Sequence, residues 1–186
     1  MFDRANQKDP NTELWQGRPY PKELLYAMRM TQKLHDFAPK ASESLQLAAR
    51  CQHIQRWEIP RENFEMDRNG YLKWRQTLQL FHVEKAAAIL NEVGYDQETI
   101  DQVAFLLQKK QLKKNEDTQI LEDVVCLVFL EFYFEDFSKK HVEEKQIDIL
   151  RKTWRKMSEN GHGAALRLPL SENTLKLVNK AIGNRQ

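Results

Sequence analysis

The feature that most constrains the fold is an uninterrupted apolar run, Val124 to Leu130, inside a longer segment of helical character. A helix that is apolar on every face has no solvent-facing side, so the segment from Gln119 to about His141 is predicted to be the central helix of its domain. Glu131 ends the run, which is too short to cross a bilayer as a helix. The sequence therefore predicts a globular fold built around one buried helix.

Turn-forming residues are scarce, which predicts that the rest of the chain is helical as well. The 186 residues include six glycines and six prolines, a composition that favours long helices over many short strands. Apolar stripes at helical spacing mark the helices, and Ser42, Asp96 and Ser171 are suited to cap three of them. The predicted helices span residues 21–37, 43–57, 71–93, 97–110, 119–141, 142–158 and 172–182.

We therefore expect an all-α protein, a single compact domain over residues 1–186 with about seven helices. Residues 1–20 are polar and rich in proline, and are expected to form an irregular segment packed on the body. Gly161 and Gly163 predict a turn, followed by an extended segment at 164–170.

Composition limits the partners of the chain. The 29 basic and 27 acidic side chains leave a net charge of +2, which does not provide the broad basic surface that non-specific nucleic-acid binding requires. A nucleic-acid partner is thus disfavoured, and any anion site is expected to be local. Cys51 and Cys126 lie in apolar surroundings, which indicates buried thiols in a reducing compartment. With no signal-peptide pattern at the amino terminus, we predict a cytoplasmic protein without a membrane partner.

Three polar residues fall on faces that helical spacing turns inward. His82 lies four residues from both Leu78 and Ala86, and Asp123 lies four residues before Leu127. His53 lies four residues after Ala49 and four before Trp57 in its own predicted helix. Because an unpartnered polar group costs about 1–3 kcal/mol when buried, such residues are candidates for a functional site.

Two imidazoles and a carboxylate from three helices suit one divalent transition-metal ion, whose identity the sequence leaves open. His53, His82 and Asp123 are therefore the predicted metal ligands and catalytic residues. The same three side chains also suit an acid, a base and an orienting group without metal. A third interpretation is structural, with each residue hydrogen-bonded separately in the core and Asp123 serving the first turn of a helix.

Basic residues near these positions predict a small anionic or phosphorylated ligand, because arginine forks match phosphate oxygens and lysine supplies a point charge. The predicted ligand-binding residues are Arg50, Arg56, Arg61, Arg75, Lys109 and Lys110. Trp57, Trp74 and Tyr71 are interleaved with them and suit either stacking on a ring or core packing. The alternative interpretation is a set of solvated faces paired with the acids of residues 58–67.

The sequence resembles two known families to different degrees. Five runs resemble, in order and spacing, a family of bacterial and fungal proteins catalogued as a domain of unknown function, number 4202. These runs are Pro21–Tyr26, Gln52–Trp57, Gly70–Arg75, Leu121–Glu131 and Ile149–Ser158. The resemblance implies an all-α, compact, single-domain protein.

A more distant resemblance is to the HD superfamily of metal-dependent phosphohydrolases. Residues Leu45–Ile54 and Leu121–Val124 are similar to the central and last motifs of that superfamily. The defining His-Asp doublet requires aspartate where Ile54 stands, and the one literal doublet, His35-Asp36, lies just before Pro39. This resemblance implies an HD-like fold with fewer carboxylates at its site.

Two functions follow as hypotheses. The first is an HD-like metal-dependent hydrolase that acts on a phosphorylated small molecule or nucleotide, with water activated by the metal. The second is a non-catalytic helical module that binds an anionic ligand, RNA or a protein partner. Convergence of His53, His82 and Asp123 on one point is the feature that separates them. The oligomeric state is not predicted, since no exposed heptad seam is visible.

Overall fold

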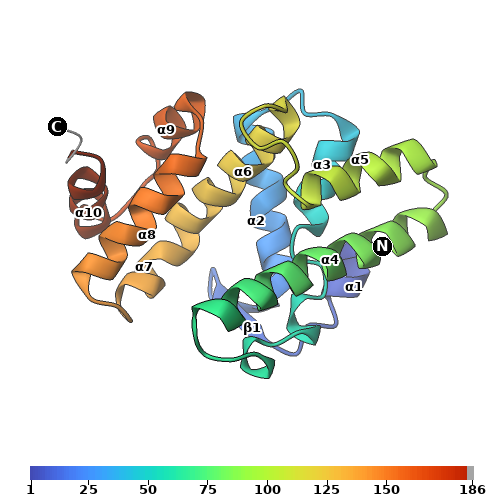
Figure 1. Ribbon diagram of the computed structural model, residues 1–186, viewed down its shortest axis with the longest axis horizontal. Helices are drawn as coiled ribbons and strands as arrows, with labels where there is room; N and C mark the ends of the chain where they lie inside the picture. Colours follow the sequence, from blue (N-terminus) through green and yellow to red (C-terminus); the bar gives the residue numbers. More distant parts are fainter. Residues whose placement is uncertain (184–186) are drawn as a thin grey trace.

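The computed structural model describes residues 1–183, which contain ten α-helices and one antiparallel hairpin (Figure 1). The longer helices are α2 (Lys22–Phe37), α3 (Glu43–Cys51), α4 (Arg68–Glu92), α5 (Gln97–Leu107), α6 (Glu116–Val128), α8 (Glu143–Lys156) and α10 (Glu172–Gly183). The shorter elements are α1 (Phe2–Asn6), β1 (Thr12–Trp15), β2 (Arg18–Pro21), α7 (Phe134–Ser138), α9 (Glu159–Ala165), two 3₁₀ turns, η1 (Arg56–Glu58) and η2 (Arg61–Asn63), and a π-helical turn, η3 (Phe129–Tyr133). The protein is mostly helical, as predicted.

Helix α6 lies between two hydrophobic clusters. One face contributes Leu121 and Val124 to a cluster with α2, α3, α4 and α5, and the other contributes Cys126 and Leu127 to a cluster with α8, α9 and α10. Figure 1 shows α6 between these two groups of helices. The prediction that this segment is the central buried helix is confirmed, because apolar residues on both faces meet a partner.

Local capping chemistry sets several helix boundaries as predicted. The Ser42 hydroxyl accepts a hydrogen bond from the amide of Leu45 at 3.2 Å, and Asp96 accepts one from Thr99 at 2.8 Å. Ser171 does the same for the amide of Thr174 at 3.3 Å. Each satisfies an amide that has no partner within its own helix, and these cap predictions are confirmed.

Other boundaries differ from the expectation of seven helices. Helices α1 and α9 are additional and short, and the π-helical turn η3 divides the predicted helix over 119–141 into α6 and the short α7. The predicted helix over 43–57 ends at Cys51, and Gln55 then takes the left-handed φ of 49° that a continuous helix excludes. The turn and extended segment predicted around 161–170 were wrong in part, since Ser158 caps α9 across both glycines through the amide of Gly161.

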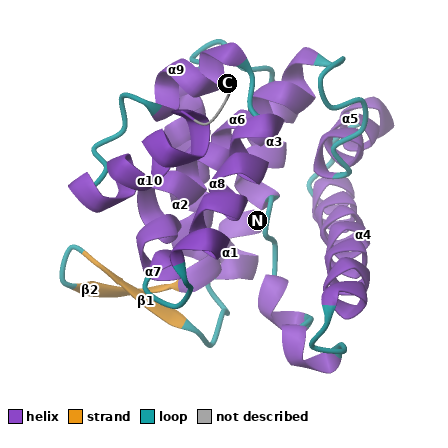
Figure 2. Cartoon of the chain, turned by 60° about the vertical axis from the view of Figure 1, so that its left-hand side comes forward, coloured by secondary structure: helices purple, strands orange, loops and turns teal. Residues whose placement is uncertain are grey.

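The expectation of an irregular segment at residues 1–20 was also wrong. Strands β1 and β2 pair antiparallel, with Thr12 opposite Pro21, and Figure 2 shows this hairpin at the edge of the helical body. Gln16 and Gly17 both have positive φ, 51° and 75°, as a two-residue hairpin turn requires. The segment is thus a folded element that covers the start of α2.

Two further expectations concern the cysteines and membrane-spanning helices. Cys51 and Cys126 are both buried and not in a disulfide, as predicted, and burial raises the pKa of both thiols, that of Cys126 to about 12. Across residues 1–183, every helix falls short of the length and apolarity that a membrane span needs.

Candidate functional site

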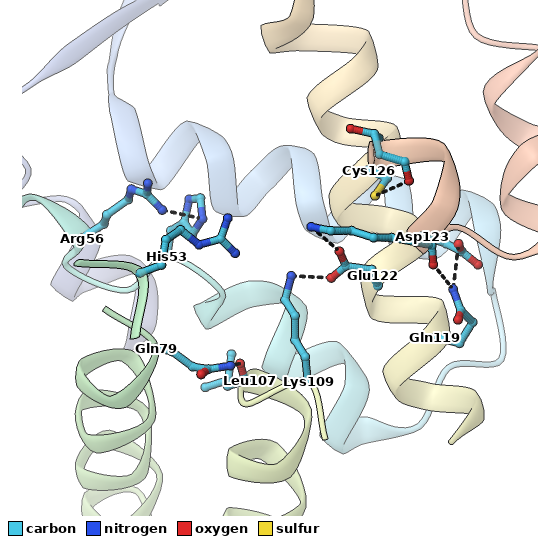
Figure 3. A network of polar contacts seen from close by, with 12 residues as sticks. His53, Arg56, Gln79, Leu107, Lys109, Gln119, Glu122, Asp123 and Cys126 are labelled. Carbon is cyan, nitrogen blue, oxygen red and sulfur yellow. Dashed lines mark hydrogen bonds and ion pairs between the residues drawn. The ribbon is translucent and has the colours of Figure 1, made fainter. Parts of the chain in front are cut away.

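His53 lies just beyond the end of α3 and is held from three sides. Its Nδ1 is 3.3 Å from Oε2 of Glu23 in α2, and its Nε2 is 3.0 Å from Nη1 of Arg56 in η1 (Figure 3). Tyr26 stacks on the imidazole with ring centroids 4.0 Å apart. The ring is 22% exposed, so solvent reaches a side chain whose orientation is fixed.

These contacts determine the tautomer of His53. A guanidinium has only N–H donors, so Nε2 must accept from Arg56 and is unprotonated. The proton of the neutral ring is then on Nδ1, the nitrogen that lies 3.3 Å from Oε2 of Glu23. Burial holds the pKa of His53 well below its usual value, and the nearby Arg56, Lys109, Arg75 and Lys22 lower it further. His53 is therefore neutral at physiological pH.

Glu23 is buried in the first turn of α2, and the N-terminal segment fixes it there. Asp9 accepts the amide of Glu23 at 2.9 Å, and Asn6 donates to its carbonyl at 3.4 Å. The Asn6 side chain also accepts a hydrogen bond from the amide of Gln55 at 2.9 Å, so Asn6 connects the start of α2 to the segment that carries His53. Burial raises the pKa of Glu23 to about 7, although Arg56 and Lys22 oppose the shift.

His82 lies beside His53, in the middle of α4. The two ring centroids are 5.8 Å apart, and the His82 side chain is buried, as its position between Leu78 and Ala86 predicted. Within the described part of the chain, its Nε2 has no hydrogen-bond partner. Burial lowers the pKa of His82 to about 2, with smaller contributions from His53 and Arg56. We call Glu23, Tyr26, His53, Arg56 and His82 the histidine site.

Arg56 brings a positive charge into the histidine site, where Glu23 acts on it from beyond ion-pair distance. Its guanidinium lies 4.9 Å from the centre of the Trp74 ring, and burial lowers its pKa. Within residues 1–183, no carboxylate lies within ion-pair distance of Arg56 or of the neighbouring Arg75, which donates to the Tyr71 hydroxyl at 3.3 Å. Two guanidinium groups are thus available to an anion.

Lys109 extends this positive region from the α5–α6 loop, but it is paired. It forms an ion pair with the buried Glu122 of α6, which Lys156 also contacts at 3.3 Å (Figure 3). Although burial opposes ionisation, the two lysines hold the pKa of Glu122 below its usual value. Lys109 contributes to the potential at His53, and its ammonium remains close to Glu122.

Asp123 does not join the two histidines. It accepts hydrogen bonds from the amide and hydroxyl of Ser158, at 2.8 and 2.5 Å, and from the Gln119 side chain at 3.1 Å. Figure 3 shows it on the far side of Glu122 from His53. Among residues 1–183, no three His, Cys, Asp or Glu side chains are grouped so as to hold a metal ion. The predicted three-residue set is therefore not assembled, because Asp123 joins α6 to α9.

Three of the six predicted ligand-binding cations are also outside the site. Arg50 forms a bidentate pair with Asp3 at 2.5 and 2.6 Å, which attaches α1 to α3. Arg61 donates to three backbone carbonyls of its own loop, at residues 64, 65 and 67, and so stabilises that loop. Lys110 is exposed. Arg56, Arg75 and Lys109 are the three that lie near His53.

Comparison with known families confirms the resemblance to the domain of unknown function, number 4202. Residues 1–178 match the family described as a domain of unknown function, DUF4202. The chain belongs to this family. No curated protein and no solved structure matched the chain. The likeness of this DUF4202 chain to the HD superfamily stays a prediction from its sequence.

Sequence reasoning missed Glu23, Tyr26 and Glu122. An acid in the first turn of a helix is usual on electrostatic grounds, so Glu23 gave no signal by itself. A signal was present in its spacing, because Glu23, Tyr26, Met30 and Leu34 form one buried line of α2. Glu122 had the stronger signal, since an acid inside a helix that is apolar all round requires a cationic partner. No local pattern identified Lys109 as that partner.

Proposed function

We propose that this DUF4202 protein binds a phosphorylated small molecule at the histidine site. The observation that carries the proposal is the Arg56 guanidinium, which is partly buried and, within residues 1–183, has a neutral imidazole and an indole face, but no carboxylate, as its contacts. Burial lowers the pKa of Arg56 although Glu23 opposes the shift, and a bound anion stabilises a charge that is withdrawn from water in this way. Such a group is typical of an anion site.

The surroundings favour phosphate over a weaker anion. Arg56, Arg75 and Lys109 all lower the pKa of His53, so a ligand that carries two negative charges beside this ring meets a positive potential. A guanidinium fork matches two phosphate oxygens, and charge-assisted hydrogen bonds of this kind are the strong ones. The imidazole Nε2 of His82, which no described residue hydrogen-bonds, is a further polar atom beside this position.

The site is local, which favours a small ligand over a nucleic acid. Arg56 and Arg75 lie on two neighbouring elements, and the protein as a whole has a net charge of +2. Tyr71 is 43% exposed, and its ring centroid lies 5.9 Å from that of Trp74. A phosphorylated ligand with a planar ring therefore has an aromatic surface beside the arginines.

Calorimetric titration with inorganic phosphate, pyrophosphate and adenosine monophosphate tests the proposal. We expect Arg56→Leu, which keeps the packing on Trp74 but removes the charge, to weaken binding by about tenfold or more, because a hydrogen bond to a charged group contributes about 1.5–3 kcal/mol. The matched control is Arg155→Leu, at an exposed position of α8, for which we expect unchanged affinity.

The outcomes are separable. Binding that Arg56→Leu weakens and Arg155→Leu does not supports the proposal. Binding that both variants leave unchanged, or an absence of binding at millimolar phosphate and pyrophosphate, contradicts it. A preference for a single-stranded RNA oligomer over all three small ligands would favour a nucleic-acid partner instead.

A further inference from the structure

The contacts of His53 go beyond what ligand binding needs. Its Nδ1 lies 3.3 Å from Oε2 of Glu23, its Nε2 is the acceptor, and Tyr26 stacks on the ring. A carboxyl group beside one imidazole nitrogen, with the other nitrogen unprotonated, is the arrangement of a general base with its orienting group. An imidazole that served only to bind an anion would need to donate from the ligand side.

We infer that His53 is a general base that activates water for hydrolysis of the bound phosphate ester, with Glu23 as its positioning residue. Arg56 releases Nε2 of His53 when its guanidinium binds the phosphate instead. The inference rests on the proposed binding of a phosphorylated ligand. It requires no residue beyond those of the histidine site.

Arg56 connects binding to base activation. Its Nη1 donates to Nε2 of His53 at 3.0 Å, which occupies the basic lone pair. A phosphate dianion is a stronger acceptor for a guanidinium than a neutral imidazole is, so the ligand draws these donors away. Nε2 then faces the bound phosphate, where a water molecule can donate to it.

The ligand also makes His53 a better base. The groups that face it are Glu23, Tyr26 and Lys22 from α2, Arg56 from η1, Arg75 and His82 from α4, and Lys109 from the α5–α6 loop. Four of these are cations, and all four lower the pKa of the ring. Two negative charges on the ligand offset them and raise that pKa towards neutrality.

The reaction balances without an additional reagent. Water gives a proton to Nε2 as its oxygen forms a bond to phosphorus, and the bond from phosphorus to the ester oxygen breaks. The leaving oxygen takes the electron pair and then receives the proton from the His53 imidazolium or from solvent. The products are an alcohol and inorganic phosphate, and Arg56 stabilises the charge on the phosphoryl oxygens.

Hydrolysis of 4-nitrophenyl phosphate, assayed in a metal chelator, tests the inference. We expect His53→Gln to lower kcat by about 10²–10⁴-fold, the usual contribution of a general base. Glu23→Gln should lower kcat with KM nearly unchanged, and Glu23→Asp should restore part of the loss. The matched control Glu84→Gln, exposed on α4, should keep the full rate.

The pH profile separates a positioning role of Glu23 from a merely structural one, and an isotope label shows which atom the water attacks. Glu23→Gln should move the acidic limb of the kcat–pH profile to lower pH, because Glu23, whose pKa is raised to about 7, no longer titrates and only protonation of His53 limits the rate. Reaction in ¹⁸O-labelled water should place one label in the released phosphate, which reports attack at phosphorus. Loss of folding alone moves neither quantity.

Failure of this inference is distinguishable from failure of the binding proposal. Arg56-dependent binding of phosphate together with no turnover above that of His53→Gln overturns the inference and leaves the binding proposal intact. Turnover that appears only when a divalent metal replaces the chelator also overturns it. If phosphate and pyrophosphate do not bind at all, both proposals are wrong.

Discussion

At the scale of single residues, His82 has the clearest energetic signature. Its side chain is buried, its Nε2 lacks a partner among the described residues, and burial lowers its pKa to about 2. In the unfolded chain a histidine has a pKa near 6.5, so below that pH the unfolded state binds a proton that the folded state does not bind. Stability from this residue therefore decreases as the pH falls from about 6.5 towards 2.

His82→Leu should remove this pH dependence. We expect the variant to gain about 2 kcal/mol in free energy of unfolding at pH 5 relative to its gain at pH 8, because the folded and unfolded states then no longer differ in proton uptake at this position. Urea denaturation at the two pH values measures the difference. The same substitution at His35, which is exposed on α2, is the control and should leave the pH dependence as it is. Equal effects of His82→Leu at both pH values would contradict the assigned burial.

Sequence periodicity located some of the site residues and not others. His82 was found because an inward-facing histidine differs from its apolar neighbours, and Arg56 because arginine so near a histidine suggests an anion. Asp123 was also correctly placed on a buried face, but the pattern could not say what it would meet. Its partner Ser158 lies 35 residues later, and contacts at that separation depend on how the helices pack.

At the scale of elements, Asp123 is a connector between α6 and α9. Its carboxylate binds the amide and hydroxyl of Ser158, which in turn caps α9, and Gly161 approaches it so closely that a Cβ there would lie 2.5 Å from Oδ1. The small residue is required by this contact. These contacts place Asp123 outside the histidine site.

Asp123→Ala should therefore destabilise the fold and leave phosphate affinity unchanged. We expect a loss of about 1–3 kcal/mol, because the buried amide and hydroxyl of Ser158 lose their acceptor. Chemical denaturation measures the loss, and calorimetry on the folded variant measures the affinity. Gly161→Ala should be destabilising by the same contact. Reduced affinity in a folded Asp123→Ala protein would restore Asp123 to the binding site.

Glu122 is the second connector, between α6, the α5–α6 loop and α8. Breaking a buried ion pair typically costs about 3–5 kcal/mol, but Lys109 and Lys156 reach solvent, so we expect Glu122→Gln to cost about 2 kcal/mol. The control is Asp148→Asn, which breaks the exposed pair with Lys152 and should cost about 0.5 kcal/mol at most. Because the pKa of Glu122 is lowered, its contribution is present above about pH 4.5 and is lost at lower pH.

Capping residues were readable in the sequence because a cap acts on amides two or three positions away. The N-terminal segment was not, since β1 and β2 are strands of four residues, β1 alternates only between exposed and half-buried positions, and β2 does not alternate. Helix α9 contains two glycines and by propensity alone reads as a turn. It forms a helix because Ser158 and Asp123 fix its first turn, which is a tertiary effect.

At the scale of the whole molecule, α6 makes the two hydrophobic clusters depend on each other. The same helix contributes Leu121 and Val124 to one cluster and Cys126 and Leu127 to the other. Loss of either cluster exposes one apolar face of α6 to water, and the helix has too few polar positions to remain stable alone. The sequence-based prediction of a single domain therefore has a specific consequence for unfolding.

We expect Leu150→Ala, in the second cluster, to weaken the first cluster by the same free energy. Leu150 is 4% exposed on α8, and truncating a buried leucine costs about 2–5 kcal/mol. Hydrogen exchange followed by mass spectrometry should show slowly exchanging amides of α3, which lies in the first cluster, losing protection as much as those of α8. Leu175→Ala, at a position 36% exposed on α10, should change neither. If α3 keeps its protection while α8 loses it, the two clusters unfold separately, and α6 would then have to remain folded with one apolar face in water.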